Sequence, residues 1–174
     1  MNKFDLVVIG AGPAGYAATM RALDFGKKVL LVEKSRIGGA GVTNGALSSK
    51  TWWEISREIR QFHNNLKRFN IHRPEVNFKE VKDEVRRAVE QRVLQLEDHL
   101  TLLRTSEKFK GCLNYMQGEA KLLSRNEVSI TTDDGLVEVY TENIILATGS
   151  KPRRLPDLAV DEKVIMTSDG IEHM

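Results

Sequence analysis

The chain has 174 residues, which is enough for one domain with a buried core. Its apolar content of 41% and charged content of 29% are typical of a globular protein, and its net charge of +2 is too small to indicate nucleic-acid binding. The single cysteine, Cys112, excludes a disulfide within the chain, and no apolar run has the length of a membrane span. We therefore expect a cytoplasmic protein that binds neither nucleic acid nor membrane.

The first 34 residues have the pattern of a strand, a turn, a helix and a second strand. Residues 4–9 are nearly all apolar, which is typical of a strand buried on both faces. Residues 14–26 favour a helix of small and apolar side chains that ends at Gly26, and residues 27–34 favour a second buried strand. Together they predict a βαβ unit.

Two helices are expected in the middle of the chain. The first covers residues 49–66, and Pro74 interrupts the pattern before the second, at about residues 77–106. An apolar stripe runs along the second helix, at Val85, Val89, Val93, Leu96, Leu100 and Leu103. We expect this stripe to pack on its own domain, with contact to a second copy of the chain as the alternative.

Short strands follow from Gly111 onward. Alternating or apolar runs occupy residues 113–123, 127–133, 136–141 and 143–150, and Asp134-Gly135 has the composition of a hairpin turn. We therefore predict an α/β fold, a doubly wound Rossmann-like domain over residues 1–150. It carries a helical insertion at about 51–107 and a small antiparallel β insertion at about 111–141, and residues 151–174 form a surface connector.

A glycine pattern joins the first strand to the first helix. Gly10, Gly12 and Gly15 have the G-x-G-x-x-G spacing. The first permits a tight turn, the second lets a pyrophosphate approach the backbone, and the third allows the helix to pack closely on the sheet. Glu33, at the end of the second strand, is placed to accept hydroxyl hydrogens of an adenosine ribose. These features predict a dinucleotide site and leave NAD and FAD open.

Three segments, taken in order, resemble the FAD-binding N-terminal region of the pyridine nucleotide-disulfide oxidoreductase family. They are the loop at residues 10–15 with Glu33, the segment GGAGVTNGALSSK at residues 38–50, and NIILATGSKP at residues 143–152. The family includes dihydrolipoamide dehydrogenase, glutathione reductase, mercuric reductase and soluble transhydrogenase. The resemblance covers about residues 4–171 and implies FAD as the cofactor.

The resemblance also implies which residues contact FAD. By position these are Gly10, Gly12, Pro13, Ala14, Gly15, Glu33, Lys34, Gly39, Lys50, Glu119, Ala120, Ala147, Thr148 and Gly149. Lys50 is the candidate catalytic residue, because a cation beside the flavin favours its reduction. No metal site is expected, since the four histidines and Cys112 lack metal-ligand spacing.

The two cysteines of the family's loop are replaced here by Gly41 and Ala46. A dithiol relay needs two sulfurs within bonding reach, and Cys112 lies far along the chain. We therefore expect no disulfide reductase activity, and we expect the two small residues to leave open space beside the flavin. Trp52 and Trp53 either line that space or cover the core, and the second interpretation is favoured.

Family members are longer and continue into a nicotinamide-binding domain with its own glycine loop, whereas this chain has one such loop. The connector therefore leads toward a missing domain, and the chain by itself is expected to be inactive. In complete form we expect an FAD-dependent NAD(P)H oxidoreductase without a dithiol relay, similar to a transhydrogenase or a diaphorase. NAD(P)H is then a co-substrate of the longer protein, and the small-molecule electron acceptor is unknown. The alternatives are a catalytically silent FAD- or nucleotide-binding module and an NAD-binding domain without flavin.

Overall fold

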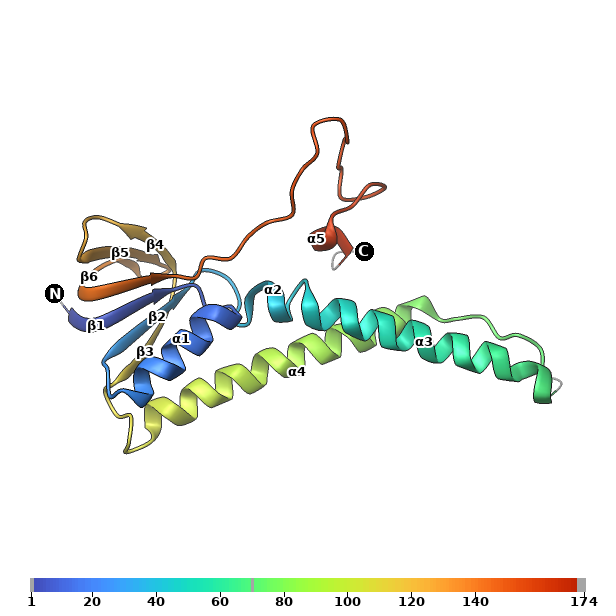
Figure 1. The fold of residues 1–174 in the computed structure, drawn as a ribbon, viewed down its shortest axis with the longest axis horizontal. Coiled ribbons are helices and arrows are strands. Elements are labelled where there is room, and N and C mark those ends of the chain that lie inside the picture. Colours follow the sequence, from blue (N-terminus) through green and yellow to red (C-terminus); the bar gives the residue numbers. More distant parts are fainter. Residues whose placement is uncertain (1, 70, 172–174) are drawn as a thin grey trace.

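The computed structural model describes residues 2–69 and 71–171. Within these ranges six strands and five helices are present (Figure 1). In chain order they are β1 (Asn2–Ile9), α1 (Pro13–Asp24), β2 (Val29–Glu33), α2 (Gly39–Val42), α3 (Ala46–Phe69), α4 (Phe78–Thr105), β3 (Leu113–Gln117), β4 (Glu119–Leu122), β5 (Glu127–Thr132), β6 (Gly135–Leu146) and α5 (Ser168–Ile171). None of the helices in the described ranges is long and apolar enough to cross a membrane.

All six strands belong to one sheet, in the order β3-β2-β1-β6-β5-β4. The first four are parallel neighbours, since β1 pairs with β2 and β6, and β2 pairs with β3. Every residue of β2 is buried, which explains why this strand is apolar without alternation until Glu33. The predicted Rossmann-like α/β fold, with a βαβ unit at its start, is confirmed.

Two expectations about the strands are corrected. The stretch Leu113–Gln117, expected within the antiparallel insertion, pairs parallel with β2 as the edge strand β3. The strands expected at 136–141 and 143–150 form one strand, β6, which pairs antiparallel with β5 at its start and parallel with β1 further along. Local alternation shows which residues face the core, whereas pairing direction depends on partners distant in the sequence.

Each face of the parallel sheet has a different cover. On one face, Val8 and Leu31 pack with apolar side chains of α1 and α4. On the other face, Val7 and Leu30 pack with apolar side chains of β5 and β6. Neighbouring strand residues serve opposite faces because side chains along a strand alternate with a period of two. Figure 1 shows this arrangement, with the antiparallel strands on the side of the sheet away from α1 and α4.

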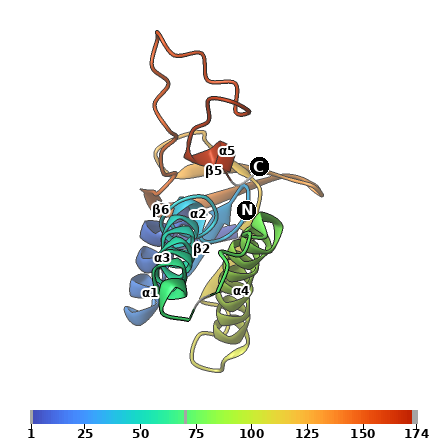
Figure 2. The same cartoon turned by 90° about the vertical axis from the view of Figure 1, so that its right-hand side faces the viewer.

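Helices α3 and α4 lie side by side as a long hairpin that extends beyond the sheet (Figures 1 and 2). The carboxamide oxygen of Asn77 accepts the N–H of Glu80 and caps the start of α4. Val85 and the four stripe residues that follow are buried, and those four join the core formed with β1 and β2. The expectation that the stripe packs on its own domain is confirmed.

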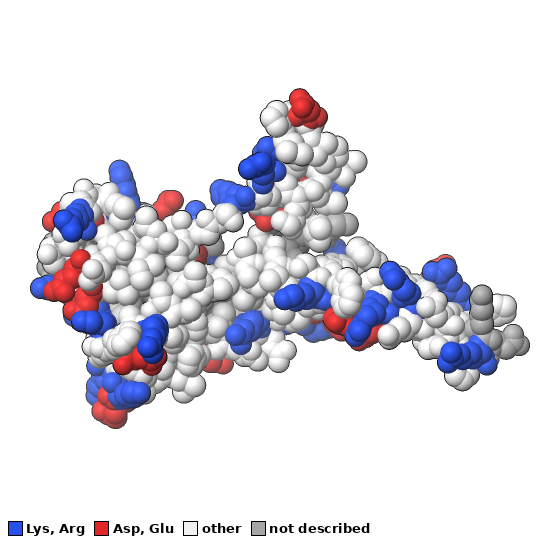
Figure 3. Space-filling model, viewed as in Figure 1, with Lys and Arg blue, Asp and Glu red and all other residues white. Residues whose placement is uncertain are grey.

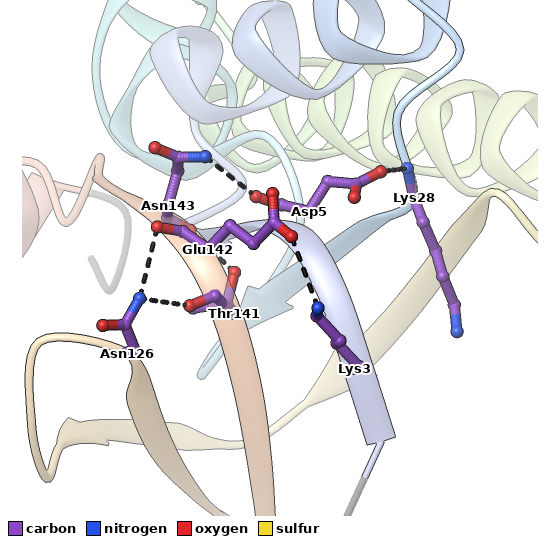
Figure 4. Close-up of polar contacts among 7 residues, drawn as sticks. All are labelled: Lys3, Asp5, Lys28, Asn126, Thr141, Glu142 and Asn143. Carbon is purple, nitrogen blue, oxygen red and sulfur yellow. Dashed lines mark hydrogen bonds and ion pairs between the residues drawn. The ribbon is translucent and has the colours of Figure 1, made fainter.

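Polar contacts join the segments around the amino end of β1 (Figure 4). The N–H of Lys28 donates to the carboxylate of Asp5 at 2.7 Å, and the Asn126 amide donates to the carbonyl oxygen of Thr141 at 2.8 Å. The amide of Asn143 donates to the carbonyl oxygen of Asp5 at 3.2 Å. The first bond joins β1 to the turn before β2, and the other two lie near the stretch of β6 at which its pairing passes from β5 to β1.

Candidate functional site

The glycine pattern lies where the ends of β1 and β6 meet the start of α1. Gly10 has a φ of +104° and donates its N–H to the carbonyl oxygen of Val32 at 2.7 Å. A Cβ atom at Gly10 would overlap the carbonyl oxygen of Ala147, and one at Gly15 would overlap the carbonyl oxygen of Gly10. Both positions therefore need glycine, one for the turn and one for the close packing of α1 on the sheet.

The N-terminus of α1 is open to an anion. Gly12 is the N-cap, Pro13 begins the helix, and its first turn holds no acidic residue. The N–H groups of Ala14 and Gly15 belong to the first turn, where backbone donors have no acceptor within the helix. A Cβ atom at Gly12 would lie 3.8 Å from the Cα of Gly39, an ordinary contact. Packing therefore does not require glycine here, and its absent side chain leaves room for a phosphate group.

Glu33 is buried, with 9% of its surface exposed, and both of its carboxylate oxygens bind backbone donors. Oε2 accepts the N–H of Ala11 at 2.7 Å, and Oε1 accepts the N–H of Ser35 at 2.9 Å. A carboxylate oxygen can accept two hydrogen bonds. Each oxygen of Glu33 therefore keeps one lone pair for a ribose hydroxyl. Glu33 therefore orients the glycine loop as well as offering acceptors to a ligand, and the first of these roles was not expected from the sequence.

Helix α2 packs directly on the glycine loop. Gly38 has a φ of +101° and donates its N–H to the carbonyl oxygen of Ala11 at 2.9 Å. A Cβ atom at Gly39 would lie 2.9 Å from the Cα of Gly12, closer than side chains tolerate. The two glycine-rich turns, which lie in separate parts of the sequence, therefore form one site.

The two positions expected to leave open space differ from each other. A Cβ atom at Gly41 would lie 2.5 Å from Cγ of Pro13, so the proline ring fills this position and the expectation of open space there is wrong. Ala46 is exposed at the start of α3. Lys50 is also exposed, and it lies on the same face of α3 because residues four apart are neighbours on a helix.

The adjacent tryptophans have different surroundings. Trp52 is half-buried and stacks on Phe78 of α4, with the ring centroids 5.7 Å apart. Trp53 is 61% exposed and carries the guanidinium of Arg57 over its ring. The expectation of a core position is therefore wrong for Trp53, because one residue step turns a helix by about 100° and moves it away from α4.

The end of β2 also meets the start of β4. Gly118 donates its N–H to the carbonyl oxygen of Glu33 at 2.9 Å, which places the neighbouring Glu119 and Ala120 beside β2. The amide of Gln117 donates to the carbonyl oxygen of Ser35 at 3.1 Å. Gln117 was not among the expected site residues, and only the pairing of β3 with β2, which puts Gln117 beside Glu33, reveals it.

Tyr115 contributes a neutral phenol near this end of the sheet. Burial raises the pKa of Tyr115, and the negative charges of Glu33 and Glu97 raise it further. Tyr115 therefore stays protonated at neutral pH and adds no charge to the surroundings of Glu33.

The remaining expected residues lie at the rim of this region. Ala147 donates its N–H to the carbonyl oxygen of Ile9 at 2.8 Å, directly after β6, and Thr148 and Gly149 follow it at the end of the strand. Lys34 is exposed next to Glu33.

An open helix N-terminus and a buried glutamate, both at the carboxyl ends of parallel strands, define a dinucleotide-binding domain. Residues 4–173 match the family model described as pyridine nucleotide-disulphide oxidoreductase, and the chain belongs to this family, as its FAD-binding region. It is 34% identical over 169 residues to dihydrolipoyl dehydrogenase of Manduca sexta, covering 95% of the chain and 32% of the relative. It is 30% identical over 172 residues to soluble pyridine nucleotide transhydrogenase of Hahella chejuensis, covering 97% and 35%.

Solved structures show the same fold. A cysteine-to-serine mutant of the flavoprotein disulfide reductase RclA of Escherichia coli, as a Cu(II) complex, matches all of this chain and 35% of its own, with a TM-score of 0.79 at 19% identity. LpdA of Mycobacterium tuberculosis matches all of this chain and 37% of its own, also with a TM-score of 0.79 at 19% identity. The chain thus spans about a third of the length of the proteins it matches.

Proposed function

We propose that the full-length protein is a flavin-dependent NAD(P)H oxidoreductase that works without a dithiol relay, as a transhydrogenase or a diaphorase does. The observation that carries this proposal is the loop at residues 38–50, which has Gly41 and Ala46 where the family pattern has cysteines. The ring of Pro13 already fills the space next to Gly41. Without sulfur in this loop, electrons pass from the flavin directly to a small-molecule acceptor.

Cys112 offers no substitute for the two sulfurs. Its carbonyl oxygen accepts the N–H of Val29 at 2.7 Å, so it lies at the amino end of β2. Glu33 is at the other end of that strand, and a rise of about 3.3 Å per residue puts the two ends about 13 Å apart. The only thiol of the chain therefore lies at the amino ends of the parallel strands, whereas the glycine loop lies at their carboxyl ends.

The residues at the glycine loop fit FAD for three reasons. The first-turn N–H groups of α1 have no acceptor within the helix, Gly12 has no side chain to obstruct a phosphate, and Glu33 offers a buried carboxylate. When bound, FAD supplies two-electron chemistry by accepting a hydride from NAD(P)H. We propose that Gly10, Gly12, Pro13, Ala14 and Gly15 hold the pyrophosphate. Glu33 accepts hydroxyl hydrogens of the adenosine ribose, with Lys34 beside it, and Glu119 and Ala120 line the adenine. Gly39 and residues 147–149 line the rest of the cofactor.

Lys50 is the proposed catalytic residue. Its exposed ammonium lies one helical turn after Ala46, on the same face of α3. A cation at this place stabilises the negative charge that develops on a flavin as it is reduced.

The first test is the visible absorption spectrum of the chain after incubation with FAD and gel filtration. Retained flavin absorption supports the proposed site, and a colourless protein from both this chain and the full-length protein contradicts it.

The second test compares NAD(P)H oxidation by the full-length protein with a quinone or dye and with a disulfide as acceptor. We expect turnover with the first class alone, and equal turnover with a disulfide would contradict the proposal. The 174-residue chain alone is expected to be inactive in both assays.

The second candidate function is a catalytically silent FAD-binding module. It differs from the first candidate in predicting that FAD is bound without any oxidation of NAD(P)H. Retained FAD together with no NAD(P)H oxidation by the full-length protein would support it. The alternative of an NAD-binding domain without flavin is set aside, because the chain belongs to a flavoprotein family.

We also propose that the protein forms a homodimer through the hairpin of α3 and α4. Large apolar side chains are exposed there, at Trp53, Phe62, Phe69, Ile71, Val76 and Phe78. Ile71 and Val76 line an open groove of about 910 Å³, Phe62 lines a neighbouring groove, and basic groups lie along the same hairpin (Figure 3). Phe62→Asp is expected to weaken dimerisation at least tenfold in light scattering, whereas Phe25→Asp, on another exposed ring just after α1, leaves it unchanged. A monomeric wild-type chain of full length would contradict the proposal.

Two further expectations remain proposals. We propose a cytoplasmic location, supported by a single cysteine in 174 residues. We also propose that the cofactor-binding domain ends near residue 150, supported by the end of the last strand at Leu146.

A further inference from the structure

The segment that follows β6 leaves the sheet and returns toward the turn between α2 and α3 (Figures 1 and 2). There the amide Nδ2 of Asn44 donates to the carboxylate Oδ1 of Asp169 at 2.6 Å. Both side chains are partly buried, and 125 residues separate them in the sequence. Asn44 lies between α2 and α3, and Asp169 lies in the first turn of α5.

The segment presents Asp169 from a turn that is held by its own hydrogen bonds. The carboxylate of Asp161 accepts the N–H groups of residues 163, 164 and 165 at 2.9, 2.8 and 3.0 Å. The carboxylate of Glu162 accepts the N–H and the hydroxyl of Thr167 at 3.0 and 2.9 Å. The hydroxyl oxygen of Thr167 in turn accepts the N–H of Asp169 at 3.2 Å. The position of Asp169 therefore depends on the order of residues 161–169.

A continuous chain of contacts runs from Asn44 to the glycine loop. The Thr43 hydroxyl lies 3.2 Å from Oδ1 of Asn44 and 3.0 Å from the carbonyl oxygen of Gly39, and the Thr43 N–H donates to that carbonyl at 2.9 Å. Gly39 packs against Gly12, the N-cap of α1. These contacts connect Asn44 to the loop whose N–H groups face the proposed pyrophosphate.

We propose that Asn44 and Asp169 are positioning residues whose hydrogen bond couples docking of residues 151–171 to the shape of the phosphate-binding loop. The effect on cofactor affinity rests on the proposed FAD binding, whereas docking of the segment does not. Coupling of this kind is reciprocal. If docking of the segment strengthens FAD binding by a given factor, FAD binding strengthens docking by the same factor.

Docking is tested first, on the chain without FAD, by the rate of tryptic cleavage after Arg154 and Lys163 relative to cleavage after Arg125. Asn44→Asp sets two carboxylates against each other, and we expect cleavage to accelerate about fivefold, the scale of one lost hydrogen bond. The double variant Asn44→Asp/Asp169→Asn exchanges donor and acceptor and should return the rate to within about twofold of wild type. Ser49→Asp, which adds the same charge at an exposed position of α3, is the control and should leave the rate unchanged. An unchanged rate in Asn44→Asp, or no rescue in the exchange, overturns the proposal.

Coupling is tested second, by FAD titration of the same variants followed by flavin fluorescence. We expect Asn44→Asp to weaken FAD binding by about the factor seen in proteolysis, and the exchange to restore it. Faster cleavage with an unchanged FAD affinity overturns the coupling. If the wild-type chain and the full-length protein bind no FAD, the proposed function fails, and a positive proteolysis result still establishes the docking contact.

Discussion

The carboxylate of Glu33 holds the N–H of Ala11 at 2.7 Å, and this bond joins the end of β2 to the turn that follows β1. The second oxygen holds the N–H of Ser35, so each oxygen of this buried carboxylate accepts one backbone donor of the chain itself. The residue that is proposed to recognise the ribose is therefore also part of the fold around the glycine loop.

Glu33→Gln is expected to lower both stability and FAD affinity. An amide has one acceptor oxygen, so its NH₂ group would face one of the two backbone N–H donors. Leaving a buried donor unpaired costs about 1–3 kcal/mol in the free energy of unfolding. Urea denaturation of the chain without FAD measures this cost, and FAD titration measures the second effect. Glu138→Gln, at an exposed position of β6, is the control, and an equal loss in both variants would contradict a structural role of Glu33.

Gly12→Ala is expected to separate binding from folding. The added methyl group meets only the Cα of Gly39 at 3.8 Å, so we expect the free energy of unfolding to change by less than about 1 kcal/mol. The same methyl group occupies the approach to the first-turn N–H groups of α1, so FAD affinity should fall at least tenfold. Gly10→Ala is the contrasting variant, because φ of +104° and the contact with Ala147 make it strongly destabilising. Unchanged FAD binding in Gly12→Ala would exclude pyrophosphate from this loop.

Introducing cysteine at the two positions of the family's dithiol should have unequal effects. Gly41→Cys drives its Cβ into the ring of Pro13, and overpacking of this kind costs about 1–3 kcal/mol of stability. Ala46→Cys adds a sulfur at an exposed position and should change stability by less than about 0.5 kcal/mol. Thermal and urea denaturation of both variants under reducing conditions measure the difference. Equal stabilities would mean that the contact between Gly41 and Pro13 is not a constraint on this loop.

The apolar stripe of α4 should stabilise the domain through its buried members alone. Leu100 is 3% exposed and belongs to the core with β1 and β2, whereas Leu102 is 67% exposed on the same helix. We expect Leu100→Ala to cost about 2–5 kcal/mol in the free energy of unfolding. Leu102→Ala should cost less than about 0.5 kcal/mol, which makes it the matched control. A large loss of stability in Leu102→Ala, with none in Leu100→Ala, would mean that α4 packs on the sheet through a different face.

Much of the fold follows from local patterns in the sequence. The all-apolar run of β2, the helical stripe of α4 and the glycine spacing after β1 each report a constraint within a few residues, namely burial, helical period and backbone conformation. The expected helix at about 77–106 differs from α4 by about one residue at each end, and the structure adds the side chain of Asn77 as the cap of its first turn. Helix α3 begins three residues earlier than expected, at Ala46, because Gly45 and Ala46 follow the loop without a strong local signal.

By itself the sequence determined that the chain has a glycine-rich turn, a glutamate at the end of a buried strand, and no sulfur at the loop positions. Only the tertiary structure decided that Leu113–Gln117 joins the parallel sheet, that Pro13 fills the space at Gly41, and that Asn44 meets Asp169. The physical reason is the range of the interactions. Hydrophobic period and backbone conformation act between near neighbours, whereas strand direction, steric contact and side-chain pairing arise between residues that folding brings together from distant parts of the chain.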